Sequence, residues 1–159
     1  MPYQNLLVPI APTEDAGWLL ARAAEVAAGF QASTVLMAVL ELPVGVRPSD
    51  PEAERFRSEV EGRLTALADD FGRTGLPVAT LVREGHTVTE ILEALTRLGT
   101  DMVVIGTHGR TGIRRLVLGS IAEAVVRRSP VPVLVVPAPL RLDTEDINPA
   151  TEDQPPPTE

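Results

Sequence analysis

The sequence contains no cysteine and no lysine, and only 3% of its 159 residues are aromatic. Without cysteine there can be no disulfide, no thiol nucleophile and no zinc–thiolate site. Without lysine the chain can form no Schiff base, and it cannot contain the loop GxxxxGK[ST], which excludes P-loop nucleotide hydrolysis. Because aromatic residues are few, the core must be built from Val, Leu, Ile and Ala. That composition is typical of parallel strands covered by alanine-rich helices.

Long apolar runs and basic clusters are also scarce. No apolar stretch approaches the roughly 20 residues needed to cross a bilayer, and the first residues lack the basic start of a signal peptide. The formal net charge is −8, which argues against a nucleic-acid partner. These features predict a cytoplasmic protein that binds neither membranes nor nucleic acid.

The acidic charge is concentrated at the carboxyl end. From Arg141 onward there are six acidic residues and one arginine, so this segment carries −5 of the net charge. Residues 139–159 are rich in proline and acid and poor in large apolar side chains, which predicts a flexible tail. The remaining residues, 1–138, are long enough for one domain.

Apolar runs alternate with segments of helical periodicity along this domain. Strands are predicted over 5–10, 33–40, 76–84, 101–106 and 131–137, and helices over 13–30, from about 51, 87–99 and 120–129. Thr13 is the predicted N-cap of the first helix, with Glu14 and Asp15 in its first turn. The alternation predicts a parallel sheet with helices on both faces. A ligand crevice is expected beyond the carboxyl ends of the strands, where the strand order reverses.

The stretch "GTHGRTGIRRLVLGS", residues 106–120, begins where the fourth strand ends. Gly106 and Gly109 would allow a sharp turn that presents backbone N–H groups, and Gly119 and Ser120 open the next helix, whose N-terminus favours an anion. Arg110 could add a guanidinium, so the stretch can form a phosphate-binding cradle without lysine. The alternative is a surface loop whose glycines serve turns and a tight helix–strand contact.

Two histidines and two further side chains have types that can serve a functional site. His108 could donate to a phosphate or hydrogen-bond nearby backbone, and both interpretations stay open. His86 is predicted to be a turn residue, and two histidines so far apart form no recognisable metal site. Trp18 is interpreted as a packing residue of the first helix. Asp101 is interpreted as a turn residue rather than a catalytic base.

Gly106, Gly109, Gly119 and Ser120 match the pattern Gly-x2-Gly-x9-Gly-Ser, and "REGHTVTEIL" precedes them in the matching order. Over residues 3–137 the sequence therefore resembles the universal stress protein family, in its nucleotide-binding form. The resemblance implies a five-stranded parallel sheet of order 3-2-1-4-5, a Rossmann-like fold of the adenine nucleotide alpha hydrolase type. It also implies a homodimer formed through the strand Val131–Val136. The implied role of the protein is that of a regulator or sensor of stress.

The implied ligand is ATP, or AMP or ADP, often with Mg²⁺. By position in the family pattern, the implied nucleotide-binding residues are Pro9, Ile10, Ala11, Val39, Gly106, Thr107, His108, Gly109, Arg110, Gly119, Ser120 and Ile121.

Ala11 departs from the family pattern. Nucleotide-binding members carry an aspartate at this place, and a lost charge-assisted hydrogen bond is worth on the order of 1.5–3 kcal/mol, or roughly one to two orders of magnitude in affinity. One alternative function is therefore a dimeric interaction protein that has lost its nucleotide. A slow ATP-hydrolysing or self-phosphorylating enzyme is the other, but no triad or general base can be assigned, so no catalytic residue is predicted.

The last predicted strand suggests self-association independently of the resemblance. Pro130 and Pro132 remove two N–H donors at its start, which fits an edge strand. Val133 to Val136 would then leave a long apolar edge open, and the same strand of a second chain could cover it.

Overall fold

The computed structural model describes residues 3–12, 15–107 and 118–139. Within these ranges strands and helices alternate strictly along the chain. The strands are β1 (Asn5–Pro9), β2 (Ser33–Leu40), β3 (Val78–Glu84), β4 (Met102–Gly106) and β5 (Val133–Val136). The helices are α1 (Gly17–Phe30), α2 (Pro51–Gly72), α3 (Thr87–Arg97) and α4 (Ser120–Arg128). The predicted tail, 139–159, lies outside the described residues except for Pro139.

The strands form one parallel sheet of order β3-β2-β1-β4-β5, as predicted. The central strand β1 pairs with β2, where Asn5 lies opposite Ser33, and with β4, where Leu6 lies opposite Met102. After β1 the chain moves outward through β2 to β3, and then crosses back to β4 on the other side of β1. The strand order therefore reverses between β1 and β4.

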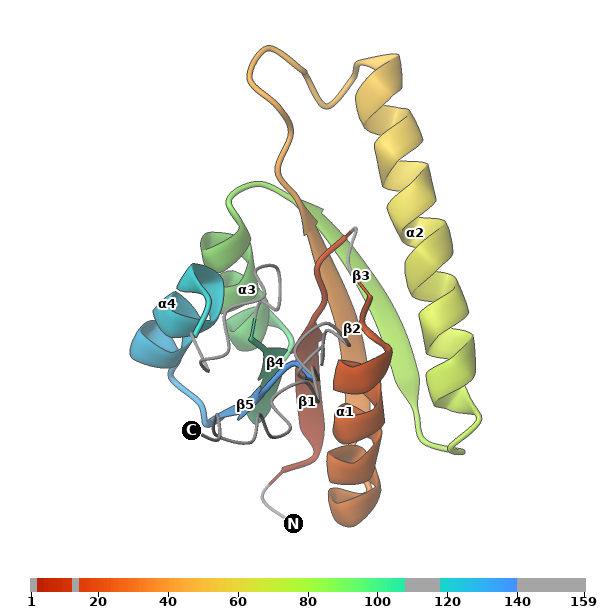
Figure 1. Ribbon diagram of the computed structural model, residues 1–159, viewed down its shortest axis with the longest axis vertical. Coiled ribbons are helices and arrows are strands. Elements are labelled where there is room, and N and C mark those ends of the chain that lie inside the picture. The colour runs from red at the N-terminus through yellow and green to blue at the C-terminus, as the bar shows by residue number, and fades with distance from the viewer. Residues whose placement is uncertain (1–2, 13–14, 108–117, 140–159) are drawn as a thin grey trace, which may run out of the picture.

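Helices cover both faces of the sheet, with α1 and α2 on one side and α3 and α4 on the other (Figure 1). Successive side chains of a strand point to opposite faces. In β1, Leu6 and Val8 pack with α1 and α2, whereas Leu7 packs with α3 and α4. All three side chains are buried. The apolar run of β1 is thus explained by burial on both faces, which is characteristic of parallel sheets.

The start of α1 differs from the prediction. The helix begins at Gly17 with Ala16 in the N-cap position, so the prediction of an N-cap at Thr13 and acidic residues in the first turn is wrong. Asp15 lies before the helix, where its Oδ1 accepts a hydrogen bond from the backbone N–H of Gly17 at 3.0 Å. An aspartate side chain readily accepts a hydrogen bond from the backbone N–H two residues further along the chain. Asp15 therefore forms a local turn here instead of a turn of helix.

Asp101 ties two strands together at the amino-terminal edge of the sheet. Its Oδ2 accepts hydrogen bonds from the backbone N–H groups of Gln4, at 2.8 Å, and Asn5, at 2.9 Å. Asp101 itself lies in a bend just before β4, which begins at Met102. Asp101 therefore has a structural role, at the edge of the sheet opposite the carboxyl ends of the strands.

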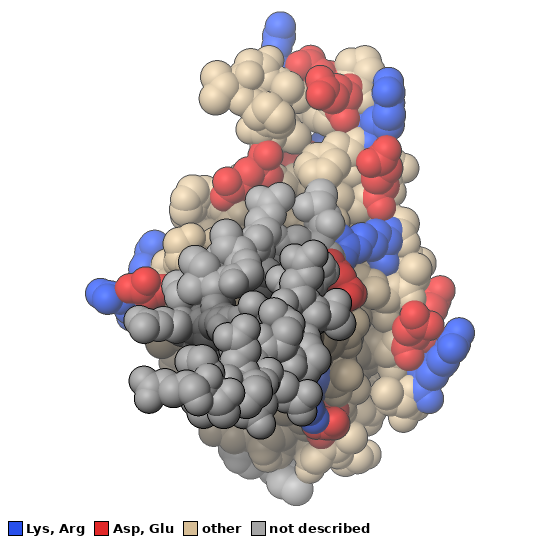
Figure 2. All heavy atoms as spheres, viewed as in Figure 1, with Lys and Arg blue, Asp and Glu red and all other residues tan. Residues whose placement is uncertain are grey.

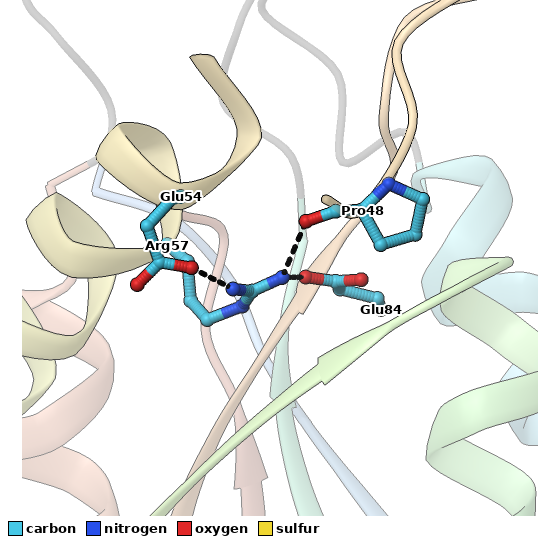
Figure 3. Close-up of polar contacts among 4 residues, drawn as sticks. All are labelled: Pro48, Glu54, Arg57 and Glu84. Carbon is cyan, nitrogen blue, oxygen red and sulfur yellow. Dashed lines mark hydrogen bonds and ion pairs between the residues drawn. The ribbon is translucent and has the colours of Figure 1, made fainter. Parts of the chain in front are cut away.

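Arg57 connects α2 to the carboxyl end of β3 (Figure 3). Its guanidinium forms ion pairs with Glu54 in the same helix and with Glu84 at the end of β3, and it lies 3.4 Å from the carbonyl oxygen of Pro48. Arg57 and Glu84 are about three-quarters buried, so this link is better shielded from solvent than the exposed ion pairs on the helices.

Acidic and basic side chains alternate over the surface of the molecule seen in Figure 2, along the side formed by α2. Several of them form pairs one helical turn apart, such as Arg73 with Asp70. Of the helices that the structure describes, none combines the length and the apolar character that a membrane span requires.

Candidate functional site

A cavity of about 250 Å³ lies at the carboxyl ends of β1 and β4, where the strand order reverses. This is the place where open parallel sheets bind their ligands. Its floor is formed by residues at the ends of strands, and its walls by the first turns of helices from both layers. The lining residues are Pro9, Ile10, Ala11, Pro12, Asp15, Ala16, Trp18, Leu19, Met37, Val39, Thr87, Ile91, Ile105, Gly106, Thr107, Ile121 and Ala122.

Seven of the residues implied by the family pattern line this cavity. They are Pro9, Ile10, Ala11, Val39, Gly106, Thr107 and Ile121. Gly119 and Ser120 do not line it, although they directly precede Ile121 at the start of α4. His108, Gly109 and Arg110 lie outside the described residues. Segments far apart in the sequence are thus brought to one site, including the ends of β1, β2 and β4.

Most of the described lining is apolar. The side chains at the end of β1 and on β2 offer hydrocarbon surface for a flat ring, and the backbone of β1 is fixed there because the N–H of Ile10 donates to the carbonyl of Met37 at 2.7 Å. Thr107 contributes a hydroxyl, but its Oγ1 accepts the backbone N–H of Ala138 at 2.9 Å. The bond joins the end of β4 to the segment after β5.

Gly106 makes a tight packing contact with Trp18. A Cβ at this position would lie 3.1 Å from Cζ2 of Trp18 and still closer to Cη2, so the indole of α1 rests directly on the backbone at the end of β4. Glycine is required here for a tight helix–strand contact, the alternative weighed from the sequence. Trp18 also lines the cavity, so its interpretation as a packing residue was incomplete.

Arg63 of α2 holds the segment between β1 and α1 in place. Its Nη1 donates to the carbonyl oxygen of Ala11 at 3.2 Å and also to that of Pro12. Both of these residues line the cavity. Arg63 is therefore a positioning residue for the cavity wall, although it lies 52 residues after Ala11 and 51 residues after Pro12 in the chain.

Of the helices that begin beside the cavity, α3 and α4 differ in what their first N–H groups contact. At α3, the carboxylate of Glu41 accepts the backbone N–H of Thr87 at 2.6 Å. At α4, the N-cap is Gly119, which has no side chain to offer and adopts an extended conformation with φ −62° and ψ 155°. Because the anion-binding capacity of α3 is already used by Glu41, the α4 N-terminus is the better candidate for a ligand phosphate.

The contact between Glu41 and Thr87 predicts a pH dependence of stability. The hydrogen bonds from Thr87, with a smaller contribution from His86, hold the pKa of Glu41 below its ordinary value of 4.5. Since the folded-state pKa is the lower one, the stabilisation is complete above about pH 4.5 and is lost as the pH falls through the lowered pKa. Glu41→Gln should therefore lower the melting temperature near pH 7, and this difference should shrink below pH 4.5.

Glu59→Gln is the matched control, because Glu59 is an exposed acid on α2. Thermal unfolding followed by circular dichroism across this pH range measures both variants. A difference between Glu41→Gln and the parent chain that stays constant with pH would contradict the prediction.

Several residues of the site were missed from the sequence. Asp15 and Thr87 line the cavity from helix starts, Trp18 from the first turn of α1, and Met37 from β2. No local pattern identifies them, since each reaches the cavity only because its helix or strand ends at this edge of the sheet. The described residues include no group of three or more His, Cys, Asp or Glu side chains that could hold a metal ion.

A parallel sheet of this order with a cavity at its reversal point defines a Rossmann-like α/β protein. Residues 2–137 match the family model described as the universal stress protein family, and the chain belongs to that family. A universal stress protein of Methanocaldococcus jannaschii is 28% identical over 142 residues, covering 86% of this chain and 84% of the relative.

Solved structures share the fold. A protein of the universal stress protein family from Burkholderia pseudomallei is 27% identical with a TM-score of 0.69, covering 86% of this chain and 97% of that one. A universal stress protein from Archaeoglobus fulgidus, in complex with dAMP, is 22% identical with a TM-score of 0.62, covering 85% of this chain and 98% of that one. At this identity the second likeness bears on the fold alone.

Proposed function

We propose that the chain binds an adenine nucleotide, ATP or its products ADP and AMP, in the cavity between β1 and β4, and acts as a nucleotide-responsive regulator in the response to stress. The observation that carries this proposal is the cavity itself, which combines an apolar floor with the adjacent N-terminus of α4. Its volume of about 250 Å³ lies just below the range of roughly 300–1,000 Å³ for small-ligand pockets.

The base and the phosphates of such a ligand match two different parts of the site, the apolar floor and the start of α4. The base would lie against the apolar residues Pro9, Ile10 and Val39, and the phosphates would lie at Gly119 and Ser120. His108, Gly109 and Arg110 would complete the phosphate cradle, as the family pattern implies. Mg²⁺ would enter with the phosphates, since it keeps most of its water and needs few protein ligands.

The test is a calorimetric titration of the nucleotide-stripped chain with ATP, ADP and AMP, with and without Mg²⁺, beside Ala11→Leu. Ala11 lines the cavity, so the larger side chain should occupy ligand space and weaken binding about tenfold or more. Because Trp18 is the one tryptophan of the sequence and lines the cavity, its fluorescence gives a second readout.

Ala66→Leu is the matched control, because Ala66 is exposed on α2, and it should bind as the parent chain does. Equal affinity of Ala11→Leu and the parent would place the ligand elsewhere. If the parent binds none of the three nucleotides, the proposal is wrong. A dimeric interaction protein without a nucleotide would then be the better description.

We also propose that the protein is a homodimer formed through β5. This strand pairs with β4 along one edge, and no described strand pairs with the other. Leu134, in the middle of β5, is 40% exposed although it is a large apolar residue. An open apolar edge strand favours pairing with another chain, and the same strand of a second copy can supply both the backbone partners and the apolar surface.

A further inference from the structure

Asp15 is the one formally charged side chain among the described residues that line the cavity. The other described lining side chains are apolar or small, apart from two threonines and the indole N–H of Trp18. Thr107 already accepts a hydrogen bond from Ala138. Among the described residues, a ligand in the cavity therefore meets one that carries a formal charge, and this residue lies just before α1.

A backbone N–H group orients the carboxylate of Asp15, and the carboxylate can still accept further hydrogen bonds. Oδ1 accepts the N–H of Gly17 at 3.0 Å, which fixes the side chain just before α1 begins. An ionised carboxylate has about four acceptor positions and no donor, so it can accept further hydrogen bonds. Asp15 is exposed to solvent in the structure described here, so its charge needs no buried partner before a ligand arrives.

The position of Asp15 selects which part of a nucleotide it can contact. Asp15 lies two residues before α1, and α4 begins at Ser120. These two helices cover opposite faces of the sheet (Figure 1). Phosphates at the start of α4 are anionic and would be repelled by a carboxylate, so they belong on the α4 side. The base fits the apolar floor. The sugar, which joins base to phosphates, carries hydroxyl donors that a carboxylate can accept.

We infer that Asp15 is the sugar-recognition residue of this cavity, accepting hydrogen bonds from the vicinal hydroxyls of a ribonucleotide. The assignment rests on the proposed function and specifies which nucleotides the site selects. Ala11 lines the same cavity but carries no polar group, whereas Asp15, four residues further along the chain and two residues before α1, carries a carboxylate. The site should accordingly prefer ribose to a sugar that lacks these hydroxyls.

The experiment is a calorimetric titration of the parent chain, Asp15→Asn and Asp15→Ala with AMP and 2′,3′-dideoxy-AMP at one ionic strength. The parent should bind AMP about tenfold or more tightly than the dideoxy analogue, because charge-assisted hydrogen bonds are the strong ones. In both variants this preference should fall to about twofold, through weaker binding of AMP. Asp15→Asn keeps an oxygen that can accept the Gly17 N–H, which preserves the local turn.

Asp69→Asn is the charge-matched control, since Asp69 is exposed on α2. It should keep the full preference for ribose. Circular dichroism of all variants establishes that they are folded.

The other outcomes separate the assignment from the proposed function. If Asp15→Asn tightens binding of both ligands and the preference for ribose persists, Asp15 only repels phosphate and the assignment is overturned. A parent chain that binds both ligands equally also overturns it, while nucleotide binding stands. If the parent binds neither AMP nor its analogue, nor ATP, the proposed function fails and the assignment fails with it.

Discussion

Gly106→Val is expected to lower the stability of the protein by about 1–3 kcal/mol, the range observed when a well-packed site is overfilled. The indole of Trp18 occupies the space that the new side chain needs, and a Cβ alone would lie 3.1 Å from Cζ2. Because Trp18 also lines the cavity, displacing its indole should weaken the proposed nucleotide binding as well. Thermal unfolding and calorimetric titration measure the two effects.

The same substitution at Gly62 is the control for Gly106→Val. A Cβ at Gly62, in the interior of α2, meets no heavy atom within 4 Å, and valine is a better helix former than glycine. Gly62→Val should therefore leave stability unchanged or raise it slightly. A loss equal to that of Gly106→Val would show that the cost does not come from the contact with Trp18.

A double variant tests whether the loss of stability in Gly106→Val comes from the contact with Trp18. Combining Gly106→Val with Trp18→Leu removes the indole that the valine meets, so the two changes should cost less together than the sum of their separate effects. Strict additivity would contradict the packing account of Gly106. The emission spectrum of Gly106→Val gives independent information, because Trp18 is the one tryptophan and its environment alone determines the signal.

Leu134→Asp is expected to convert the proposed dimer into a monomer. Leu134 lies at the centre of the exposed edge strand β5, and two copies of this strand would place a pair of carboxylates in the apolar part of the interface. Burying an unpaired charge costs several kcal/mol, enough to dissociate a dimer of ordinary affinity. The mass in solution, measured by light scattering after size exclusion, should fall to half.

Leu98→Asp is the matched control for Leu134→Asp, because Leu98 is 41% exposed, follows the last turn of α3 and is not part of β5. It should keep the mass of the parent chain. If the parent chain itself has the mass of a monomer, the proposal that β5 forms a dimer is wrong. If Leu134→Asp keeps the mass of a dimer, the interface lies on another face.

Much of the fold could be predicted because its signals are local. The apolar runs of β1, β2 and β4 and the helical stripe of α3 identify these elements, and the observed bounds differ from the predicted ones by few residues. The largest error is at the start of α1, where Asp15 bonds Gly17 in a turn. Capping and turn formation use the same residue types, so the sequence could not separate them.

The site was predicted less completely than the fold. Residues that the family pattern names at the ends of β1, β2 and β4 line one cavity, because the carboxyl ends of parallel strands meet at one edge of the sheet, and their role in binding stays a prediction. The family pattern missed Trp18, which lines the cavity from α1, and Asp15, which lines it from the segment just before that helix. For Gly106 the sequence allowed a turn, a ligand or a tight helix–strand contact, and only the structure identifies the partner in that contact, the indole of Trp18.

By itself, the sequence determined the alternation of strands and helices, the absence of P-loop and thiol chemistry, and membership of a family with a known strand order. Those properties follow from composition, periodicity and motifs, which do not depend on which distant residues meet in space. The tertiary structure alone decided that Arg63 holds Ala11, that Glu41 occupies the start of α3, and that Trp18 rests on Gly106. Such pairs lie tens of residues apart, and only the register of the sheet and the packing of its helices bring them into contact.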